Sequence, residues 1–467
     1  MAISHVFAEG VGPFKSVHLD LRGSDGRPSL GPHILAGVNG SGKSTILKAI
    51  AWCIAGPQDA FPAGEWTHYL RGDLESRVLL VLDIAGVYQY AWTVTNDLSE
   101  GWEQRLGQWV NDRLVLAELN PLDFPFQQLF VRAHGDSLRF NGARLGRQTL
   151  GQRTRVNVAA YSSSPSVRYI DRPDMAHLGK ALKMFGFEST VQNEAIQSWL
   201  LGLYSKRAIA KERHQSSSRY TASFDALERG LKCICGEEVS IVVDIEPSFQ
   251  PRLRIGSQTL NFSQIPDGVR ATLGWLADFL MRADACDWDP DVADLKPGLL
   301  LFDEIEGFLH PLWQRRLLPA IREALPTTQS IVTSHSPFVI SSCPGSIIHV
   351  LKVNSDGTAY SEPPVPAPIG ESITSTLKDI FGVDSRFDVE TEKQLAEWNE
   401  LKKTRVQNKL SAVEESRFRI LSEVLASRSE ELRSLVTKVP ELPKATVDSL
   451  TQMSEGRRPK KASLVSR

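Results

Sequence analysis

The segment Gly37–Thr45 constrains this chain more than any other feature of its sequence. It reads G-V-N-G-S-G-K-S-T, which fits the pattern G-x-x-x-x-G-K-[ST]. The apolar run His33–Ala36 precedes it, and Ile46, Leu47 and Ile50 follow at helical spacing, so the segment is predicted to join a strand to a helix. In such a loop, glycines let backbone N–H groups surround phosphate oxygens at a helix N-terminus. The sequence therefore predicts a nucleotide-phosphate site on an α/β fold.

Two side chains of this loop have separate expected tasks. Lys43 is expected to reach the β- and γ-phosphates of a nucleoside triphosphate, and the Ser44 hydroxyl is expected to coordinate Mg²⁺. The other expected cofactor-binding residues of the loop are Asn39, Gly40, Ser41, Gly42 and Thr45.

A second apolar strand, Leu299–Phe302, is predicted to end in the carboxylates Asp303 and Glu304. Asp303 is expected to hold the Mg²⁺ shell, and Glu304 is expected to orient or activate the attacking water. A buried strand that merely meets an acidic loop is the alternative, but the intact phosphate loop favours the catalytic interpretation. The next apolar strand leads to His335, which would sense the γ-phosphate or would be an ordinary capping or core histidine.

The segment Ser263–Gly268 is predicted to open a helix. Ser263, Asp267 and Gly268 are expected to bring the N-terminus of that helix to a γ-phosphate held by another subunit. An ordinary capped helix start is the alternative for a pattern this short.

Taken in chain order, these elements resemble the Walker A, signature, Walker B and switch-histidine elements of ATP-binding-cassette ATPases. The stretch Asp303–Pro311 is similar to the D-E-x-E-x-x-L-H-P pattern of the overcoming-lysogenization and RecF-like ATPases. Three further stretches are similar to the ATPase subunits of the Septu and retron-associated anti-phage systems. They are Asn193–Leu200 running into Leu203–Ala208, Ile265–Gly268 before Leu273–Asp278, and Ile380–Arg386. The resemblance covers roughly residues 1–400. It implies a P-loop ATPase core with a mixed β-sheet, a helical insertion and a C-terminal helical region.

The resemblance also implies a function. ATP and Mg²⁺ would be the cofactors, hydrolysis would be slow or regulatory, and each site would need the signature of another copy, so the chain would form at least a homodimer. Its task would be to control a separate nuclease, of the HNH type, in an anti-phage complex. The alternatives are a RecF-like DNA-repair ATPase and a nucleotide-sensing scaffold that holds a toxin or nuclease inactive.

The chain departs from the cassette pattern in two places. Its signature reads S-Q-I-P-D-G instead of L-S-G-G-Q, and the coupling glutamine of the Q-loop has only Gln127 and Gln128 as candidates. Transporter ATPases use that glutamine to couple to a membrane domain, so the departure weakens a transporter interpretation.

Five segments are expected along the chain. They are the N-terminal part of the ATPase core (1–171), a helical insertion (172–235), the C-terminal part of the core (236–370), a helical partner-binding or oligomerisation region (371–438) and a disordered basic tail (439–467). Within the core, residues 100–150 are expected to contain several turns, and Arg252–Phe262 is expected to form a strand.

Charge and composition limit the partners and the cellular compartment that we expect for the chain. Lys+Arg is 53 and Asp+Glu is 55, which excludes a broadly basic nucleic-acid coat but leaves room for local DNA or RNA contacts. The basic stretch 206–219 is one such candidate, with a solvated helix face as the alternative. No apolar run long enough to span a membrane and no signal peptide are recognised, and the five cysteines are scattered. We therefore expect a cytoplasmic protein with no membrane partner.

Overall fold

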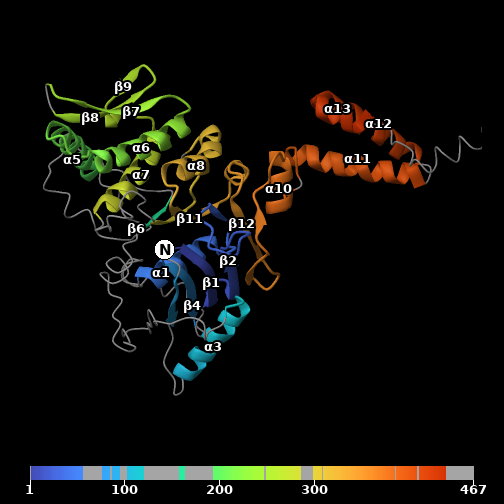
Figure 1. Ribbon diagram of the computed structural model, residues 1–467. Coiled ribbons are helices and arrows are strands. Elements are labelled where there is room, and N and C mark those ends of the chain that lie inside the picture. The colour runs from blue at the N-terminus through green and yellow to red at the C-terminus, as the bar shows by residue number, and fades with distance from the viewer. Residues whose placement is uncertain are drawn as a thin grey trace, which may run out of the picture. The chain divides into compact units, whose positions relative to one another are not determined.

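The computed structural model of the chain falls into two compact units, Met1–Val383 and Asp384–Arg467 (Figure 1). The structure describes residues 2–55, 76–84, 87–94, 102–119, 157–162, 193–246, 249–285, 298–307, 309–383, 385–407 and 410–437. Three of the expectations above lie outside these residues: the Q-loop candidates Gln127 and Gln128, the first part of the insertion (172–192) and the basic tail (439–467).

A mixed sheet of 11 strands organises the first unit. Its order is β5-β4-β1-β2-β13-β12-β3-β11-β10-β6, and β14 pairs with β12. The strands are β1 (Ala2–Val11), β2 (Phe14–Asp20), β3 (His33–Gly37), β4 (Arg77–Ile84), β5 (Val87–Val94), β6 (Asn157–Ser162), β10 (Gly298–Asp303), β11 (Thr328–Ser334), β12 (Ile347–Val353), β13 (Ala359–Ser361) and β14 (Val365–Pro366). The run from β12 to β6 is parallel, whereas β5, β4, β1 and β2 are antiparallel. This arrangement confirms the expected α/β class with a mixed sheet.

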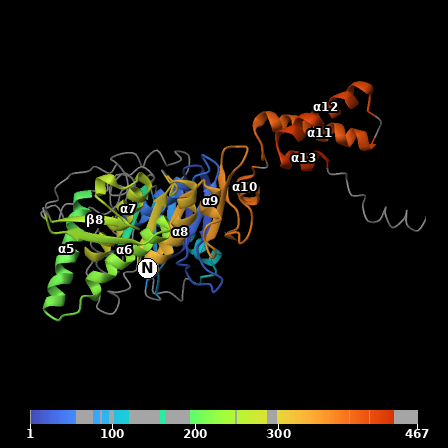
Figure 2. The ribbon, with the colours of Figure 1, turned by 90° about the horizontal axis from the view of Figure 1, so that it is seen from above.

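The helices of the first unit, in chain order, are α1 (Lys43–Ala55), α3 (Trp102–Leu116), α5 (Asn193–Glu212), α6 (Ser218–Cys235), α7 (Asp267–Ala285), α8 (Pro311–Ala324), α9 (Pro337–Ile340) and α10 (Ile373–Phe381). A separate antiparallel sheet contains β7 (Val239–Asp244), β8 (Gln250–Ile255) and β9 (Gln258–Leu260), and the short 3₁₀ helix η4 (Phe262–Gln264) follows it. Helix α6 packs against both α7 and α8, and Figures 1 and 2 show α5–α8 grouped together with β7–β9.

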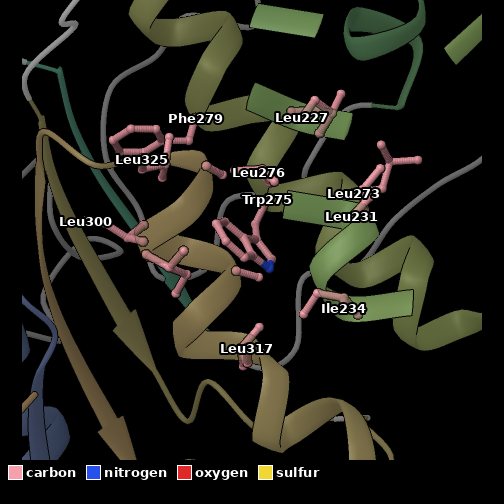
Figure 3. Packing of buried hydrophobic residues seen from close by; sticks show 14 of the residues in the cluster. Leu227, Leu231, Ile234, Leu273, Trp275, Leu276, Phe279, Leu300, Leu317 and Leu325 are labelled. Carbon is pink, nitrogen blue, oxygen red and sulfur yellow. The ribbon is translucent and has the colours of Figure 1, made fainter. Parts of the chain in front are cut away.

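The parallel strands are buried on both faces because their alternate side chains enter different cores. Leu300 and Phe302 of β10 join the core formed with α5–α9, and Leu299 and Leu301 join the core formed with α1, β1 and β2. Figure 3 shows the first of these cores, to which β10 contributes Leu300, α7 contributes Trp275 and α8 contributes Leu317. This burial explains why β10 reads as a continuous apolar run.

The second unit is built from α11 (Val389–Gln407), α12 (Ala412–Arg428) and α13 (Glu430–Thr437). It has a core of its own, in which Trp398 stacks on Phe418 with ring centroids 5.5 Å apart. Helix α12 begins with a capping box between Ser411 and Glu414, which satisfies two backbone N–H groups at its N-terminus.

The structure differs from the sequence-based expectations in three places. Helix α3 occupies a region in which the sequence indicated mainly turns. The expected strand Arg252–Phe262 divides into β8 and β9 because the chain turns at Gly256, where φ is +55°. The first unit also extends beyond residue 370 and includes α10, which packs against α9 and β3. In the described part of the chain, no helix is both long enough and apolar enough to cross a membrane.

Candidate functional site

The phosphate loop, Asp303 and His335 follow three adjacent parallel strands. Strand β11 lies between β3 and β10 and pairs in parallel with both. The loop follows β3, Asp303 ends β10, and His335 comes directly after β11. The carboxyl ends of parallel strands are the usual place for ligands in α/β sheets. The sheet thus brings three of the four predicted elements to one edge.

The glycines of the phosphate loop are required by its backbone path. Gly40 and Gly42 have φ values of +80° and +90°, which L side chains rarely adopt. A Cβ atom at Gly42 would lie 2.3 Å from the Phe14 ring, and one at Gly37 would lie 2.3 Å from the backbone oxygen of Leu351. The loop therefore packs directly on β2 and β12, with Asn39 and Gly40 left exposed and Thr45 buried below them.

Lys43 lies inside the loop. Its Nζ donates to the backbone oxygens of Gly37 (3.0 Å) and Val38 (2.9 Å). Burial lowers the pKa of Lys43 to about 8, although the carboxylates of Asp303, Glu306 and Glu304 oppose that shift. A partly desolvated ammonium group interacts more strongly with an anion than one in water does. This position suits the phosphate contact expected of Lys43.

The Ser41 hydroxyl provides a test of whether the loop fits a phosphate. Its oxygen is buried and has no hydrogen-bond partner among the described residues. A buried polar group without a partner costs about 1–3 kcal/mol, which a hydrogen bond from this hydroxyl to a bound group would offset. An unpaired hydroxyl in a glycine loop at the start of α1 fits a phosphate oxygen.

Asp303 is held by two hydroxyl groups. Its Oδ1 accepts hydrogen bonds from Ser44 Oγ (2.9 Å) and from Thr333 Oγ1 (2.7 Å). Ser44 and Asp303 were predicted as metal ligands from the sequence, and the structure brings their oxygens together. A hydroxyl and a carboxylate are hard oxygen donors of the kind that Mg²⁺ binds together with substrate phosphates. The donor set therefore fits that ion.

Glu304 lies just beyond the strand in an unusual backbone conformation. Its φ is +51°, and Thr333 Oγ1 accepts a hydrogen bond of 2.7 Å from its backbone N–H. A non-glycine residue in the left-handed region costs about 1–3 kcal/mol and is concentrated at functional sites. The strained turn leaves the Glu304 side chain exposed at the same edge as Asp303.

His335 is partly buried, and its backbone is fixed by an acidic side chain. Glu306 Oε1 accepts a hydrogen bond of 2.5 Å from the His335 backbone N–H. Burial lowers the pKa of His335 and the charge of Lys43 lowers it further, so the imidazole is neutral at physiological pH. Burial raises the pKa of Glu306.

The predicted signature residues lie in η4 and at the start of α7. Ser263 and Asp267 are exposed, and Gly268 is buried where α7 begins. A Cβ atom at Gly268 would lie 2.4 Å from the Trp313 ring of α8, so only glycine permits this close packing. Within the described part of the chain, no hydrogen bond or ion pair joins Ser263, Asp267 or Gly268 to the phosphate loop.

Thr333 and Glu306 belong to this site but were not predicted from the sequence. Thr333 joins Asp303 to Glu304 through one hydroxyl, and Glu306 fixes the turn that carries His335. Thr333 has no motif of its own, and only its place next to β10 would have indicated it. Glu306 lies within the acidic stretch Asp303–Pro311, and that position is the signal that could have indicated it.

Two families of AAA domains match parts of the chain. Residues 248–341 match a family described as "AAA domain, putative AbiEii toxin, Type IV TA system", and residues 6–93 match a family described as "AAA domain". The matched ranges contain the phosphate loop, the signature segment, Asp303, Glu304 and His335.

Several curated proteins are similar to the chain. Septu protein PtuA of Bacillus thuringiensis is 32% identical over 115 residues, which is 22% of this chain and 29% of that protein. Retron Ec83 probable ATPase of Escherichia coli is 31% identical over 129 residues, or 27% of this chain and 23% of that protein. Retron Vc95 probable ATPase of Vibrio cholerae serotype O1 biovar El Tor is 18% identical over 74% of this chain and 73% of its own length. The first two alignments thus span less than a third of each relative.

Among solved structures, similarity was found to an SMC head bound to the C-winged helix domain of ScpA. Its TM-score is 0.41 and its identity is 16%, over 78% of this chain and 98% of that one. The SMC head domain from Thermotoga maritima has a TM-score of 0.37 and 14% identity, over 79% of this chain and all of the other.

Proposed function

We propose that this chain, a relative of the Septu and retron ATPases, binds ATP with Mg²⁺ and hydrolyses it. The observation that carries the proposal is the hydrogen-bonded group of Ser44, Asp303 and Thr333, with Lys43 beside it. This group combines a phosphate contact with metal ligands, and it has the order in the chain that P-loop ATPases require.

Each residue of the edge has one task in this proposal. The phosphate loop and Lys43 bind the phosphates, and Ser44 and Asp303 hold Mg²⁺, which when bound would neutralise phosphate charge. Glu304 orients the attacking water and takes up its proton. His335, neutral and donating from its imidazole, contacts the γ-phosphate. The fixed hydrogen bonds of Thr333 and Glu306 hold these groups ready, so little reorganisation is needed during the reaction.

A second copy of the chain completes the site. Among the described residues, no hydrogen bond or ion pair joins Ser263, Asp267 or Gly268 to the phosphate loop of their own chain. Ser263 and Asp267 are exposed at the start of the 19-residue helix α7. The positive end of that helix is suited to a γ-phosphate presented by another copy. The functional ATPase is therefore at least a homodimer.

Nucleotide binding and turnover of Lys43→Ala test the proposal. Lys393→Ala is the matched control because that lysine is exposed in the second unit. We expect Lys43→Ala to lose calorimetric ATP binding and phosphate release, and the control to keep both. In the unmutated chain, turnover per molecule should rise with protein concentration as dimers form. Undiminished ATP binding by Lys43→Ala would refute the site.

The wider role that we propose is regulation of a separate nuclease, of the HNH type, in an anti-phage complex. Similarity to Septu PtuA and to the retron ATPases supports this role. The second unit supports a docking task, because its own core leaves Val389, Val413 and Ile420 exposed. Turnover stimulated by gapped DNA without any nuclease partner would favour a RecF-like repair ATPase instead. Inhibition of a nuclease by bound ATP without turnover would favour a scaffold.

A further inference from the structure

We propose that Arg270 is a positioning residue that holds the segment 263–268 in the conformation that closes the nucleotide site of a second copy. This inference rests on the proposed function above, and it adds a residue that no motif of the sequence indicated. Arg270 lies in the first turn of α7 and does not itself reach the nucleotide in this account.

The guanidinium of Arg270 contacts three acceptor oxygens of the segment 263–268. Its Nη2 donates to the backbone oxygens of Ile265 (2.7 Å) and Ser263 (3.2 Å), and its Nη1 lies 3.0 Å from Asp267 Oδ1. The Arg270 side chain is only 25% exposed, whereas that of Asp267 is 87% exposed. A planar guanidinium can hold several acceptors in fixed directions, which the point charge of a lysine cannot do.

These contacts change the electrostatics of the exposed surface. Carbonyl and carboxylate oxygens next to a helix N-terminus would repel an incoming phosphate. Because the oxygens of Ser263 and Ile265 are bonded to a cation, their partial charges are compensated. Asp267, whose carboxylate is exposed at the start of α7, is compensated by the same guanidinium. Arg270 therefore makes this surface compatible with an anion.

The segment has other anchors, so its fold does not depend on Arg270 alone. Phe262 and Ile265 are buried in the core shared with α7 and α8. Gly268 packs against Trp313, and the Gln264 side chain accepts a hydrogen bond of 3.0 Å from the backbone N–H of Asn261. We therefore expect replacement of Arg270 to change the conformation of the exposed residues 263 and 264 more than the stability of the chain.

Three full-length variants test the proposal: Arg270→Ala, Arg270→Lys and the matched control Arg254→Ala, whose side chain is exposed on β8. We expect kcat for ATP hydrolysis to fall at least tenfold in Arg270→Ala. The affinity for ATP and the midpoint of thermal unfolding should stay near the values of the control. Arg270→Lys should recover only part of kcat, because lysine keeps the positive charge but lacks the planar guanidinium that holds several acceptors at once.

Mixing two inactive variants shows whether Arg270 has a positioning role or only a general structural one. Lys43→Ala has an impaired phosphate loop and an intact segment 263–268. Arg270→Ala has an intact phosphate loop and an impaired segment 263–268. A 1:1 mixture of the two inactive variants should regain about a quarter of the unmutated rate, since half of the dimers are mixed and each mixed dimer has one intact site of two. A misfolded Arg270 variant would restore nothing.

The outcomes distinguish failure of the Arg270 proposal from failure of the proposed ATPase function. If Arg270→Ala turns over ATP like Arg254→Ala while Lys43→Ala is inactive, the role of Arg270 is refuted and the ATPase proposal stands. If Lys43→Ala itself keeps full turnover, the proposed function fails first. If both variants are inactive and folded but their mixture stays inactive, Arg270 does not act on a second copy.

Discussion

Replacing Thr333 by valine should uncouple nucleotide binding from hydrolysis. The Thr333 hydroxyl donates to Asp303 and accepts from the Glu304 backbone, both at 2.7 Å. Valine has nearly the same shape and removes only these two hydrogen bonds. A hydrogen bond to a charged group contributes about 1.5–3 kcal/mol, and an unpaired polar group costs about 1–3 kcal/mol. We therefore expect the free energy of unfolding to fall by about 2.5–6 kcal/mol.

The larger effect is expected in catalysis. Glu304 holds a φ of +51°, and without the bond from its N–H its carboxylate is no longer fixed. A loss of about 2 kcal/mol of transition-state stabilisation would lower kcat about 30-fold. ATP binding should change much less because Lys43 and the phosphate loop keep their contacts.

The assay compares Thr333→Val with Thr333→Ser at saturating Mg²⁺ and ATP. Phosphate release gives kcat, calorimetry gives the affinity for ATP, and urea unfolding gives stability. Thr333→Ser keeps the hydroxyl, so its kcat should stay within a few-fold of the unmutated chain. Equal kcat values for the two variants would refute the reasoning that the hydroxyl positions Glu304.

Three other predictions concern the loop, the core and the second unit. Gly42→Ala should abolish ATP binding and lower the urea midpoint, because the new methyl group meets the Phe14 ring at a φ of +90°; an unchanged ATP affinity would contradict this. Burial lowers the pKa of His33 to about 4 and that of His349 to about 3, so below pH 6.5 the unfolded chain takes up protons that the folded chain does not. The free energy of unfolding should therefore decrease as the pH falls from 6.5 towards 4, by up to about 1.4 kcal/mol per histidine and pH unit, and equal urea midpoints at pH 7 and 5 would contradict this. Deletion of residues 388–467 should keep ATP binding and lose co-purification of the nuclease partner; full recovery of the partner would refute a docking role for the second unit.

Much of the fold could be predicted from the sequence where periodicity and local chemistry agree. The continuous apolar run Leu299–Phe302 located β10, and the glycine pattern located the loop before α1, because these signals lie within a few neighbouring residues. Helix α3 was missed although Leu106, Trp109 and Leu114 recur at helical spacing and pack on β1 and β4.

Only those site residues that belong to a local sequence motif could be predicted. Lys43, Ser44 and Asp303 belong to motifs whose residue types follow from phosphate and metal chemistry. Thr333 became recognisable only when β11 was paired beside β10, since no local pattern links residues 30 positions apart. Arg270 was missed for a related reason: its role comes from three acceptors that the turn before α7 brings together.

The central claim is tested most directly by single-turnover hydrolysis of Mg²⁺–ATP in Glu304→Gln. Glutamine keeps the size and polarity of the side chain and removes the carboxylate that would take up a proton. At matched and saturating occupancy, the account predicts ATP bound as tightly as in the unmutated chain, with phosphate release slowed at least 100-fold. Phosphate release at the unmutated rate from fully occupied Glu304→Gln would contradict it.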